Sequence, residues 1–298
     1  MRDRASAEAS LVGNAGVGAR PTLPSAPAEL AVVFDDVAES YDAEVLGFFA
    51  PVAGHLLDRL ALRGHEALLD IGCGSGAVLT AAGWRLGPRS EMTGIDASAR
   101  MIERARGALR GTPAGQARLL VMDGQRPELS PGAFDLITAS MVLFFLPDPS
   151  AALRSWSRLL RPGGRVGITS FGEQTDAWRH LDEAFEPFVP RHVFDARTRA
   201  PRGVFASDEA LADCFQSAGF PSVETSQAII DVVFDDVDDW HRFTMSNSQS
   251  ALWESVSPSN RPLVLERAAE RLEGFRGADG RLHLEQHIRV TIAQSDAA

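Results

Sequence analysis

Residues 67–76 read Ala-Leu-Leu-Asp-Ile-Gly-Cys-Gly-Ser-Gly, an apolar run that reaches an acid and then turns with glycine at every second position. A helical pattern follows directly, over residues 77–86. A buried strand, a glycine-rich turn and a helix form the unit that places a cofactor at the carboxyl end of a parallel strand. The segment therefore predicts a cofactor-binding loop.

Strand and helix patterns go on alternating after this loop. Further strands are expected at 91–96, 117–123, 134–140 and 165–171, with helices at 98–109 and 150–160. Two later strands are expected at 222–233 and 281–293, and the turn at residues 278–280 allows the last strand to insert antiparallel. This rhythm predicts an α/β fold: a doubly wound, Rossmann-like sheet of seven strands, mostly parallel with an antiparallel last strand, plus a helical cap.

The remaining segments suggest how the chain is organised around that sheet. Residues 1–28 are rich in Ala, Ser, Gly and Pro, which favours a mobile N-terminal tail. We expect residues 29–298 to form a single domain with N-terminal helices over 29–62. The segments at about 172–206 and 240–277 interrupt the strand rhythm, and we expect them to form an inserted cap that shapes the pocket for a second substrate.

Composition limits the possible partners. The 298 residues are 45% hydrophobic and carry a net charge of -11, so the chain can bury a sizeable core but is poorly suited to phosphate backbones. Two cysteines cannot build a disulfide framework, and no apolar run approaches the roughly 20 residues that span a bilayer. We expect a cytoplasmic protein with no nucleic-acid or membrane partner; an oligomer is compatible with the sequence.

Three of the expected strands end in an acid: Asp70, Asp96 and Asp123. Asp96 follows Gly76 by twenty residues, the separation at which a carboxylate accepts hydrogen bonds from both ribose hydroxyls of a cofactor. The glycine spacing is Gly-x-Gly-x-Gly, whereas dinucleotide-binding folds carry Gly-x-Gly-x-x-Gly. An NAD-dependent oxidoreductase shares the fold and the ribose acid, and it stays as an alternative.

Taken in order, these motifs resemble the class I S-adenosylmethionine-dependent methyltransferases, in particular the small-molecule branch with ubiquinone/menaquinone-type and natural-product enzymes. The resemblance extends over about residues 32–171. The segments that carry it are 34–42, 69–76, 94–98, 122–125, 134–137 and 159–165. It implies S-adenosylmethionine as the cofactor and S-adenosylhomocysteine as its product.

The resemblance also implies roles for individual residues. Asp70 would orient the ammonium group of the cofactor, Asp96 would take the ribose hydroxyls, and Asp123 would accept a hydrogen bond from the adenine amine. The other implied cofactor-binding residues lie in the glycine loop, around adenine, near the sulfonium and over the methionine end: Gly72, Gly74, Gly76, Ala97, Met101, Gly124, Gln125, Ser140 and Tyr41.

Methyl transfer requires alignment of the two substrates and, where the acceptor must lose a proton, a base. Glu173 and His180 are the catalytic candidates, because they follow the fifth strand where acceptors bind in such folds. His192 and His241 are weaker candidates. His283 and His287 lack a visible third ligand, so no metal site is expected. Aromatic residues crowd positions 144–205, which favours an apolar or aromatic acceptor.

The sequence thus predicts a methyltransferase of natural-product biosynthesis. It would move the methyl group of S-adenosylmethionine to an O, N or C nucleophile of a small acceptor by in-line displacement. After the fourth strand the chain reads Ser140-Met141-Val142-Leu143, which lacks the Asn/Asp-Pro-Pro-aromatic tetrapeptide of nucleic-acid amino methyltransferases. Besides the oxidoreductase, the alternative is a protein of this fold that binds the cofactor but catalyses a non-methylating reaction.

Overall fold

The computed structural model describes residues 35, 47–87, 89–198, 203–245 and 249–296, with the side chains of 196–198 and 251 outside that description. The expected tail at 1–28 and Tyr41 lie outside the described residues. So does most of the first half of the helical segment expected at 29–62. Residues 47–60 of that segment form one helix that leads into the sheet.

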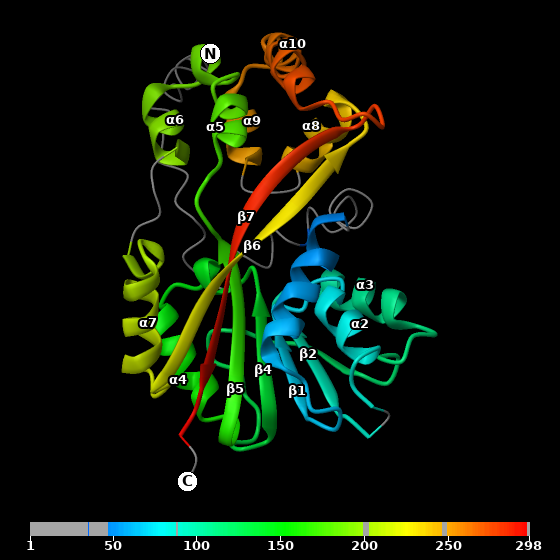
Figure 1. Ribbon diagram of the computed structural model, residues 1–298, viewed down its shortest axis with the longest axis vertical. Helices are drawn as coiled ribbons and strands as arrows, with labels where there is room; N and C mark the ends of the chain where they lie inside the picture. Colours follow the sequence, from blue (N-terminus) through cyan, green and yellow to red (C-terminus); the bar gives the residue numbers. More distant parts are fainter. Residues whose placement is uncertain (1–34, 36–46, 88, 199–202, 246–248, 297–298) are drawn as a thin grey trace, which may run out of the picture.

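A seven-stranded sheet forms the centre of the described chain, in the order β3-β2-β1-β4-β5-β7-β6 (Figure 1). Strands β1 to β5 pair in parallel, and β7 runs antiparallel to both of its neighbours, β5 and β6. This confirms the predicted mixed sheet. The strands are β1 (Leu68–Ile71), β2 (Met92–Asp96), β3 (Arg118–Val121), β4 (Phe134–Ser140), β5 (Leu160–Phe171), β6 (Ser222–Phe234) and β7 (Leu282–Gln294).

Helices cover both faces of the sheet, because its central strands are apolar on both sides. All four residues of β1 are buried. The helix at 47–60 packs with α2 (Ala77–Gly83) and α3 (Ala99–Leu109) in one apolar cluster, and α4 (Pro149–Ser157) packs with α7 (Asp208–Ser217) in a second. The result is the three-layered arrangement of a doubly wound fold.

The boundary between α4 and β5 differs from the expected one. The helix ends at Ser157 instead of residue 160, and β5 begins at Leu160 instead of residue 165. The pairing of β5 with β4 shifts register between Phe134↔Leu160 and Leu136↔Arg165, so residues 161–164 form a bulge within the strand. The Pro-Gly-Gly sequence predicted a turn here, and the bulge accommodates it without ending the strand.

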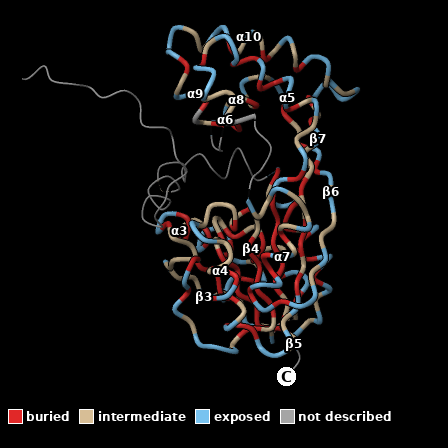
Figure 2. Tube along the Cα trace, turned by 90° about the vertical axis from the view of Figure 1, so that its left-hand side faces the viewer, coloured by how far each residue is buried: buried red, intermediate tan, exposed pale blue. Residues whose placement is uncertain are grey.

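A group of helices lies beyond the carboxyl edge of the sheet and is separated from it in both views (Figures 1 and 2). We call this group the cap. It contains α5 (Asp176–Asp182), α6 (Arg191–Thr198), α8 (Val237–Met245), α9 (Ser250–Ser255) and α10 (Arg261–Leu272). Short 3-10 turns connect parts of the chain: η1 (Leu143–Phe145), η2 (Glu186–Phe188), η3 (Gly203–Phe205) and η4 (Glu273–Phe275).

Strands β6 and β7 continue past the sheet into the cap. β7 pairs with β5 only as far as Phe171↔Ile288, whereas β6 and β7 stay paired up to Phe234↔Leu282. We call this two-stranded extension, residues 228–234 and 282–288, the arm. Its side chains Phe234, Leu282 and Leu284 are buried in the larger apolar cluster. The arm therefore joins the cap to the sheet. Within the described residues, no helix combines the length and apolar character that a membrane crossing requires.

Candidate cofactor and acceptor site

The glycine loop after β1 takes a backbone path that only glycine follows without strain. Gly72, Gly74 and Gly76 have φ angles of +65°, +52° and +95°, in the left-handed region. A Cβ atom on Gly72 would lie 2.5 Å from Cγ2 of Val142, which comes just after β4. A Cβ atom on Gly74 would meet nothing within 4 Å. The loop thus packs against the end of β4 at Gly72 and is open at Gly74.

Asp70, on β1, is a buried carboxyl group with only one of its two oxygens hydrogen-bonded in the described chain. Its residue is 1% exposed, and its Oδ1 accepts a hydrogen bond from the hydroxyl of Thr138 at 2.7 Å. Its Oδ2 is buried without a partner in the described chain. Burial raises the pKa of Asp70 to about 7, with a further rise from the nearby Asp96 and a partial offset by Thr138. A cationic ligand at Oδ2 would relieve this burial cost.

Asp96 ends β2 and holds the glycine loop from the neighbouring strand. Its Oδ2 accepts the backbone N–H of Gly74 and its Oδ1 accepts that of Ser98, both at 2.9 Å. Burial raises the pKa of Asp96, and these backbone hydrogen bonds lower it in part. Each carboxylate oxygen has a second lone pair, so Asp96 can still accept hydroxyl groups from a ligand.

A third acid contacts the segment after β2. Asp35 accepts a hydrogen bond from the hydroxyl of Ser98, and its backbone carbonyl accepts the guanidinium of Arg100 at 3.1 Å. Ser98 also caps α3, because its hydroxyl accepts the backbone N–H of Met101 at 3.0 Å. Asp35 therefore contacts the start of α3, beside the half-buried Ala97. The Met101 side chain is buried.

The segment after β3 is fixed by hydrogen bonds to α4. Asp123 accepts the backbone N–H of Gln125 at 2.8 Å. The Gln125 amide donates to the carbonyl of Asp148 at 2.8 Å, and the indole N–H of Trp156 donates to the carbonyl of Gly124 at 2.8 Å. The Gln125 side chain is therefore engaged in holding this segment, while Asp123 is half-buried at its edge.

Backbone strain marks the end of β4. Met141 has a φ angle of +59°, which is costly for a residue with a long side chain. Its backbone N–H donates to the hydroxyl of Thr169 at 3.0 Å, and that hydroxyl also lies 3.0 Å from the hydroxyl of Ser140. This strained turn brings Val142 against Gly72. The half-buried Ser140 is thereby held at the carboxyl edge, beside the loop.

The two catalytic candidates lie in different environments. Glu173 follows β5 directly and is exposed, with no side-chain hydrogen bond in the described chain. His180 lies on α5, in the cap, and its Nδ1 is 3.3 Å from a carboxylate oxygen of Glu183 on the same helix. Only Glu173 is adjacent in sequence to the carboxyl edge of the sheet.

Two of the other histidine candidates, His241 and His283, have local partners. His192 is exposed on α6. His241 packs its ring 4.3 Å from that of Trp253, and burial lowers its pKa. The Nδ1 of His283 lies 2.8 Å from Asp231, and its Nε2 lies 3.2 Å from Asp279; hydrogen bonds to both acids raise its pKa. The described residues contain no group of three His, Cys, Asp or Glu side chains arranged to hold a metal ion.

A chain of aromatic rings crosses from the sheet edge to the cap. Phe171, at the end of β5, is 42% exposed and lies with its ring centroid 5.7 Å from that of Phe144 and 6.4 Å from that of Phe48. Phe48 in turn contacts Phe243 of the cap at 6.3 Å, and Phe243 contacts Trp178 at 6.2 Å. The exposed ring of Phe171 therefore forms part of a larger aromatic surface.

Several residues of this site are absent from the sequence-based prediction. Thr138 pairs in register with Asp70 across β1 and β4, and a hydroxyl in the middle of the mostly apolar strand 134–140 was the available signal. Val142 and Met141 shape the loop through backbone geometry, which the sequence does not display. Asp35 lies in the segment 34–42 that carries the family resemblance, but its contact with Ser98 is a tertiary one.

Comparisons with known proteins agree with this geometry. A family model described as a methyltransferase domain matches residues 69–168. The chain is 33% identical over 243 residues to nocamycin O-methyltransferase of Saccharothrix syringae, covering 78% of this chain and 87% of that enzyme. It is also 33% identical over 162 residues to aklanonic acid methyltransferase DauC of Streptomyces sp. (strain C5), covering 54% of this chain and 74% of the relative.

Solved structures share the fold at low identity. Phosphoethanolamine N-methyltransferase 2 of Haemonchus contortus, in complex with S-adenosylmethionine, superposes with a TM-score of 0.54 at 16% identity, covering 88% of this chain and 57% of that one. The [4+2]-cyclase SpnF superposes with a TM-score of 0.56 at 18% identity, covering 93% and 99%.

The fold and the loop define a class I, S-adenosylmethionine-dependent methyltransferase. With the sequence relatives, the chain belongs to the small-molecule branch of that family.

Proposed function

We propose that this enzyme methylates an oxygen nucleophile on a small apolar or aromatic natural product, with S-adenosylmethionine as the donor. The oxygen is proposed because the relative that aligns over most of both chains is an O-methyltransferase. The apolar acceptor is proposed because Phe171 exposes its ring at the end of β5, within the aromatic chain that reaches the cap.

The observation that carries the donor half of the proposal is the unpartnered Oδ2 of Asp70. Asp70 is 1% exposed, and its Oδ2 has no hydrogen-bond donor in the described chain. Burying a carboxyl oxygen in this way is unfavourable unless a ligand donates a hydrogen bond to it. The ammonium group of S-adenosylmethionine supplies the charge and the donors that this oxygen lacks. The open space at Gly74, where a Cβ would meet nothing, leaves room for a ligand along the loop. The residues therefore fit the cofactor.

Each strand end has a proposed task toward the cofactor. Asp70 holds the ammonium group and Asp96 the ribose hydroxyls, while Asp123 accepts from the adenine amine. When bound, the cofactor supplies a methyl group on a positively charged sulfur, which is already activated for displacement. The remaining proposed contacts are Gly72, Gly74, Gly76, Ala97, Met101, Gly124, Gln125, Ser140 and Tyr41, of which Tyr41 lies outside the described residues.

The work left to the protein is to align the acceptor and to exclude water. Holding two reactants at near-attack distance contributes about 7–11 kcal/mol in favourable cases. The aromatic rings around Phe171 would hold the acceptor by its apolar body and present its oxygen to the sheet edge. Glu173 is the proposed base for an acceptor that must lose a proton, because it leaves the sheet next to Phe171. His180 is the second choice, since its ring is paired with Glu183 in the cap.

Binding and transfer can be tested separately. We expect S-adenosylhomocysteine to bind the purified protein in a calorimetric titration, and S-adenosylmethionine with an isotope-labelled methyl group to yield, from an extract of apolar metabolites, a product heavier by one methylene unit that carries the label. Glu173→Gln should leave the affinity for S-adenosylhomocysteine unchanged and lower turnover about 10²–10⁴-fold if Glu173 is the base. Absence of any response to S-adenosylhomocysteine would contradict the proposal.

The similarity in fold to the [4+2]-cyclase SpnF is the reason for a second candidate reaction. A protein of this fold can bind the cofactor and catalyse a reaction that transfers no methyl group. Cofactor binding without a methylated product, across a broad set of oxygen, nitrogen and carbon acceptors, would favour that alternative.

A further inference from the structure

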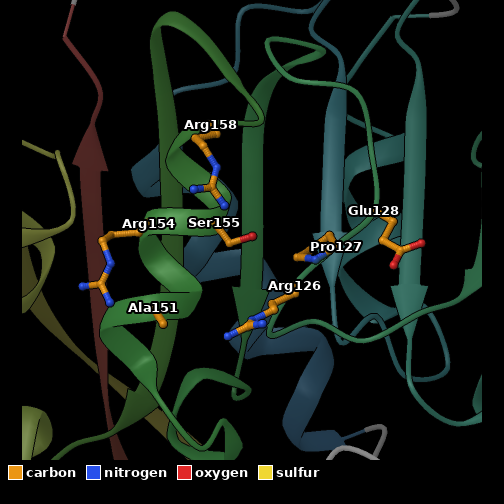
Figure 3. Close-up of a pocket in the computed structure, with 7 residues that line it drawn as sticks. All are labelled: Arg126, Pro127, Glu128, Ala151, Arg154, Ser155 and Arg158. Carbon is orange, nitrogen blue, oxygen red and sulfur yellow. The ribbon is translucent and has the colours of Figure 1, made fainter.

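A hollow on the flank of the sheet domain carries an arginine cluster that the proposed reaction does not use. It has a volume of about 430 Å³ and lies between α4 and the segment that follows the expected adenine-binding residues (Figure 3). Its charged lining consists of Arg126 and Glu128 from that segment and Arg154 and Arg158 from α4, with the hydroxyl of Ser155 between them.

The three guanidinium groups have no carboxylate partner in the described chain. Elsewhere in this acidic protein arginines do find acids: Arg161 pairs with Asp135 at 2.6 Å. Arg126, Arg154 and Arg158 are exposed and form no ion pair or side-chain hydrogen bond among the described residues. The single acid of the lining, Glu128, points its carboxylate away from them in Figure 3. The cluster therefore concentrates positive charge on a chain whose net charge is -11.

The helix dipole accounts for only part of this arrangement. Arg154 lies in the last turn of α4 and Arg158 is its C-cap, and cations are favourable at the carboxyl end of a helix. Arg126 belongs to a different segment, so its place beside α4 is not set by that helix itself. Its placement opposite the two α4 arginines requires another explanation.

We propose that this hollow binds a phosphate-bearing anion. The guanidinium fork donates two parallel hydrogen bonds to a phosphate, and three such groups match an anion with two or more negative charges better than a single carboxylate. The Ser155 hydroxyl adds a neutral donor at the floor of the site. An organic phosphate or pyrophosphate is the ligand class that this donor set fits.

The position of the hollow links it to the cofactor site. Arg126 directly follows the residues at 123–125, and these are already held to α4 through Gln125 and Trp156. An anion bound between Arg126 and either Arg154 or Arg158 would add a second link between the segment at 123–126 and α4. This link rests on the proposed function, because it assumes that residues 123–125 contact adenine. The anion site itself does not depend on that assumption.

Calorimetric titration with pyrophosphate, inorganic phosphate and glycerol 3-phosphate tests the site in the full-length protein. We expect pyrophosphate to bind more tightly than inorganic phosphate and its affinity to fall as salt is raised, since exposed charges are screened. The triple variant R126Q/R154Q/R158Q should lose at least tenfold in affinity. The matched control R89Q/R110Q/R118Q removes three exposed arginines outside the hollow, and it should stay within about threefold of the wild type.

Two results would overturn the proposal: no binding of any of the three anions, or equal losses in both triple variants. Preferential binding of glycerol 3-phosphate would support it and assign the site to a phosphomonoester. Thermal unfolding of each variant shows whether the variant is folded. If the triple variant is not folded, a single substitution of Arg126 replaces it in the titration. Titration with S-adenosylhomocysteine keeps the two proposals apart, because its failure would contradict the methyltransferase proposal and leave anion binding intact.

Discussion

The proposed donor side and the proposed acceptor side of this enzyme are built in different ways. On the donor side, the carboxyl ends of β1, β2 and β3 place acids and a glycine turn at fixed positions, and backbone hydrogen bonds such as Gly74 to Asp96 hold them. On the acceptor side, Phe171 and its aromatic neighbours come from separate segments and meet only through tertiary packing. If these assignments hold, backbone geometry specifies the donor, and side chains that can change independently specify the acceptor.

The largest effect is expected from Asp96→Ala, which removes the ribose acid from the donor side. The affinity for S-adenosylhomocysteine should fall about 10²–10⁴-fold, because two charge-assisted hydrogen bonds are lost at about 1.5–3 kcal/mol each. Calorimetric titration measures the loss. Asp96→Asn, which keeps one acceptor oxygen, should lose less. An unchanged dissociation constant would mean that Asp96 only supports the loop through Gly74 and Ser98.

Alanine substitutions in the glycine loop should separate backbone strain from steric overlap. Gly72→Ala and Gly74→Ala both put a side chain at positive φ, which costs about 1–2 kcal/mol each. Only Gly72→Ala also meets Val142, at 2.5 Å, so it should lower the free energy of unfolding by about 1–3 kcal/mol more. Chemical denaturation measures both. The double variant G72A/V142A should recover most of the difference, and equal losses in the two single variants would argue against the close packing.

Phe171→Ala should affect the acceptor side alone. Loss of the exposed ring should lower kcat/KM for an apolar acceptor about 10–100-fold, since burying a Phe side chain contributes about 1.5–3 kcal/mol. The affinity for S-adenosylhomocysteine should not change. Trp84→Ala is the control, because Trp84 is a 71% exposed aromatic residue at the end of α2 and away from the aromatic chain. Equal effects of the two substitutions on kcat/KM would show that Phe171 makes no specific contribution to acceptor binding.

The smallest expected effect is the dependence of the affinity for S-adenosylhomocysteine on pH. Since the pKa of Asp70 is raised to about 7, its carboxyl group becomes neutral below that pH and loses its attraction for an ammonium group. The affinity for S-adenosylhomocysteine should therefore fall by up to about tenfold per unit as the pH drops from 7 to 5.5. Asp70→Asn should remove this pH dependence while lowering the affinity at pH 8.

The same shift has the opposite sign for the stability of the protein without ligand. In the folded state Asp70 holds its proton up to about pH 7, whereas the ordinary pKa of an aspartate is 3.8, so its contribution to the free energy of unfolding declines as pH rises between these values. Asp70→Asn should therefore show a smaller decline than the wild type in denaturation curves from pH 4 to 7. An identical profile would show that Asp70 is charged throughout.

Much of the fold and the donor side could be predicted from the sequence. Strands that reach Asp70 and Asp96, with a glycine turn between, are local patterns, and the alternation of strands and helices predicts a doubly wound sheet. What could not be predicted depends on contacts between distant segments. The pairing of Thr138 with Asp70 and the approach of Val142 to Gly72 require the neighbouring strand to be in place.

The cap itself was expected from the sequence, but the bounds of its individual helices could not be predicted, for a different reason. Its helices α5, α6, α8 and α9 are 7, 8, 9 and 6 residues long, too short to display a helical period in the sequence. The continuation of β6 and β7 as the arm was also hidden, because a strand that leaves a sheet alternates just as it does within the sheet. Glu173 and His180 illustrate the consequence: both follow β5 in sequence, but the structure separates them between the sheet edge and α5.

The arm has a consequence for anyone who would redesign substrate choice by recombination. In many capped enzymes the cap is one insertion, and a chimaera needs two crossover points. Here the two halves of the cap are joined through strands that are each 13 residues long and belong to the sheet at their other ends. A transplanted cap would have to bring its own β6 and β7. These two strands would then replace one edge of the recipient's sheet. A crossover after β5 would therefore exchange the cap together with β6 and β7, while Phe48, Phe144 and Phe171 would stay with the recipient.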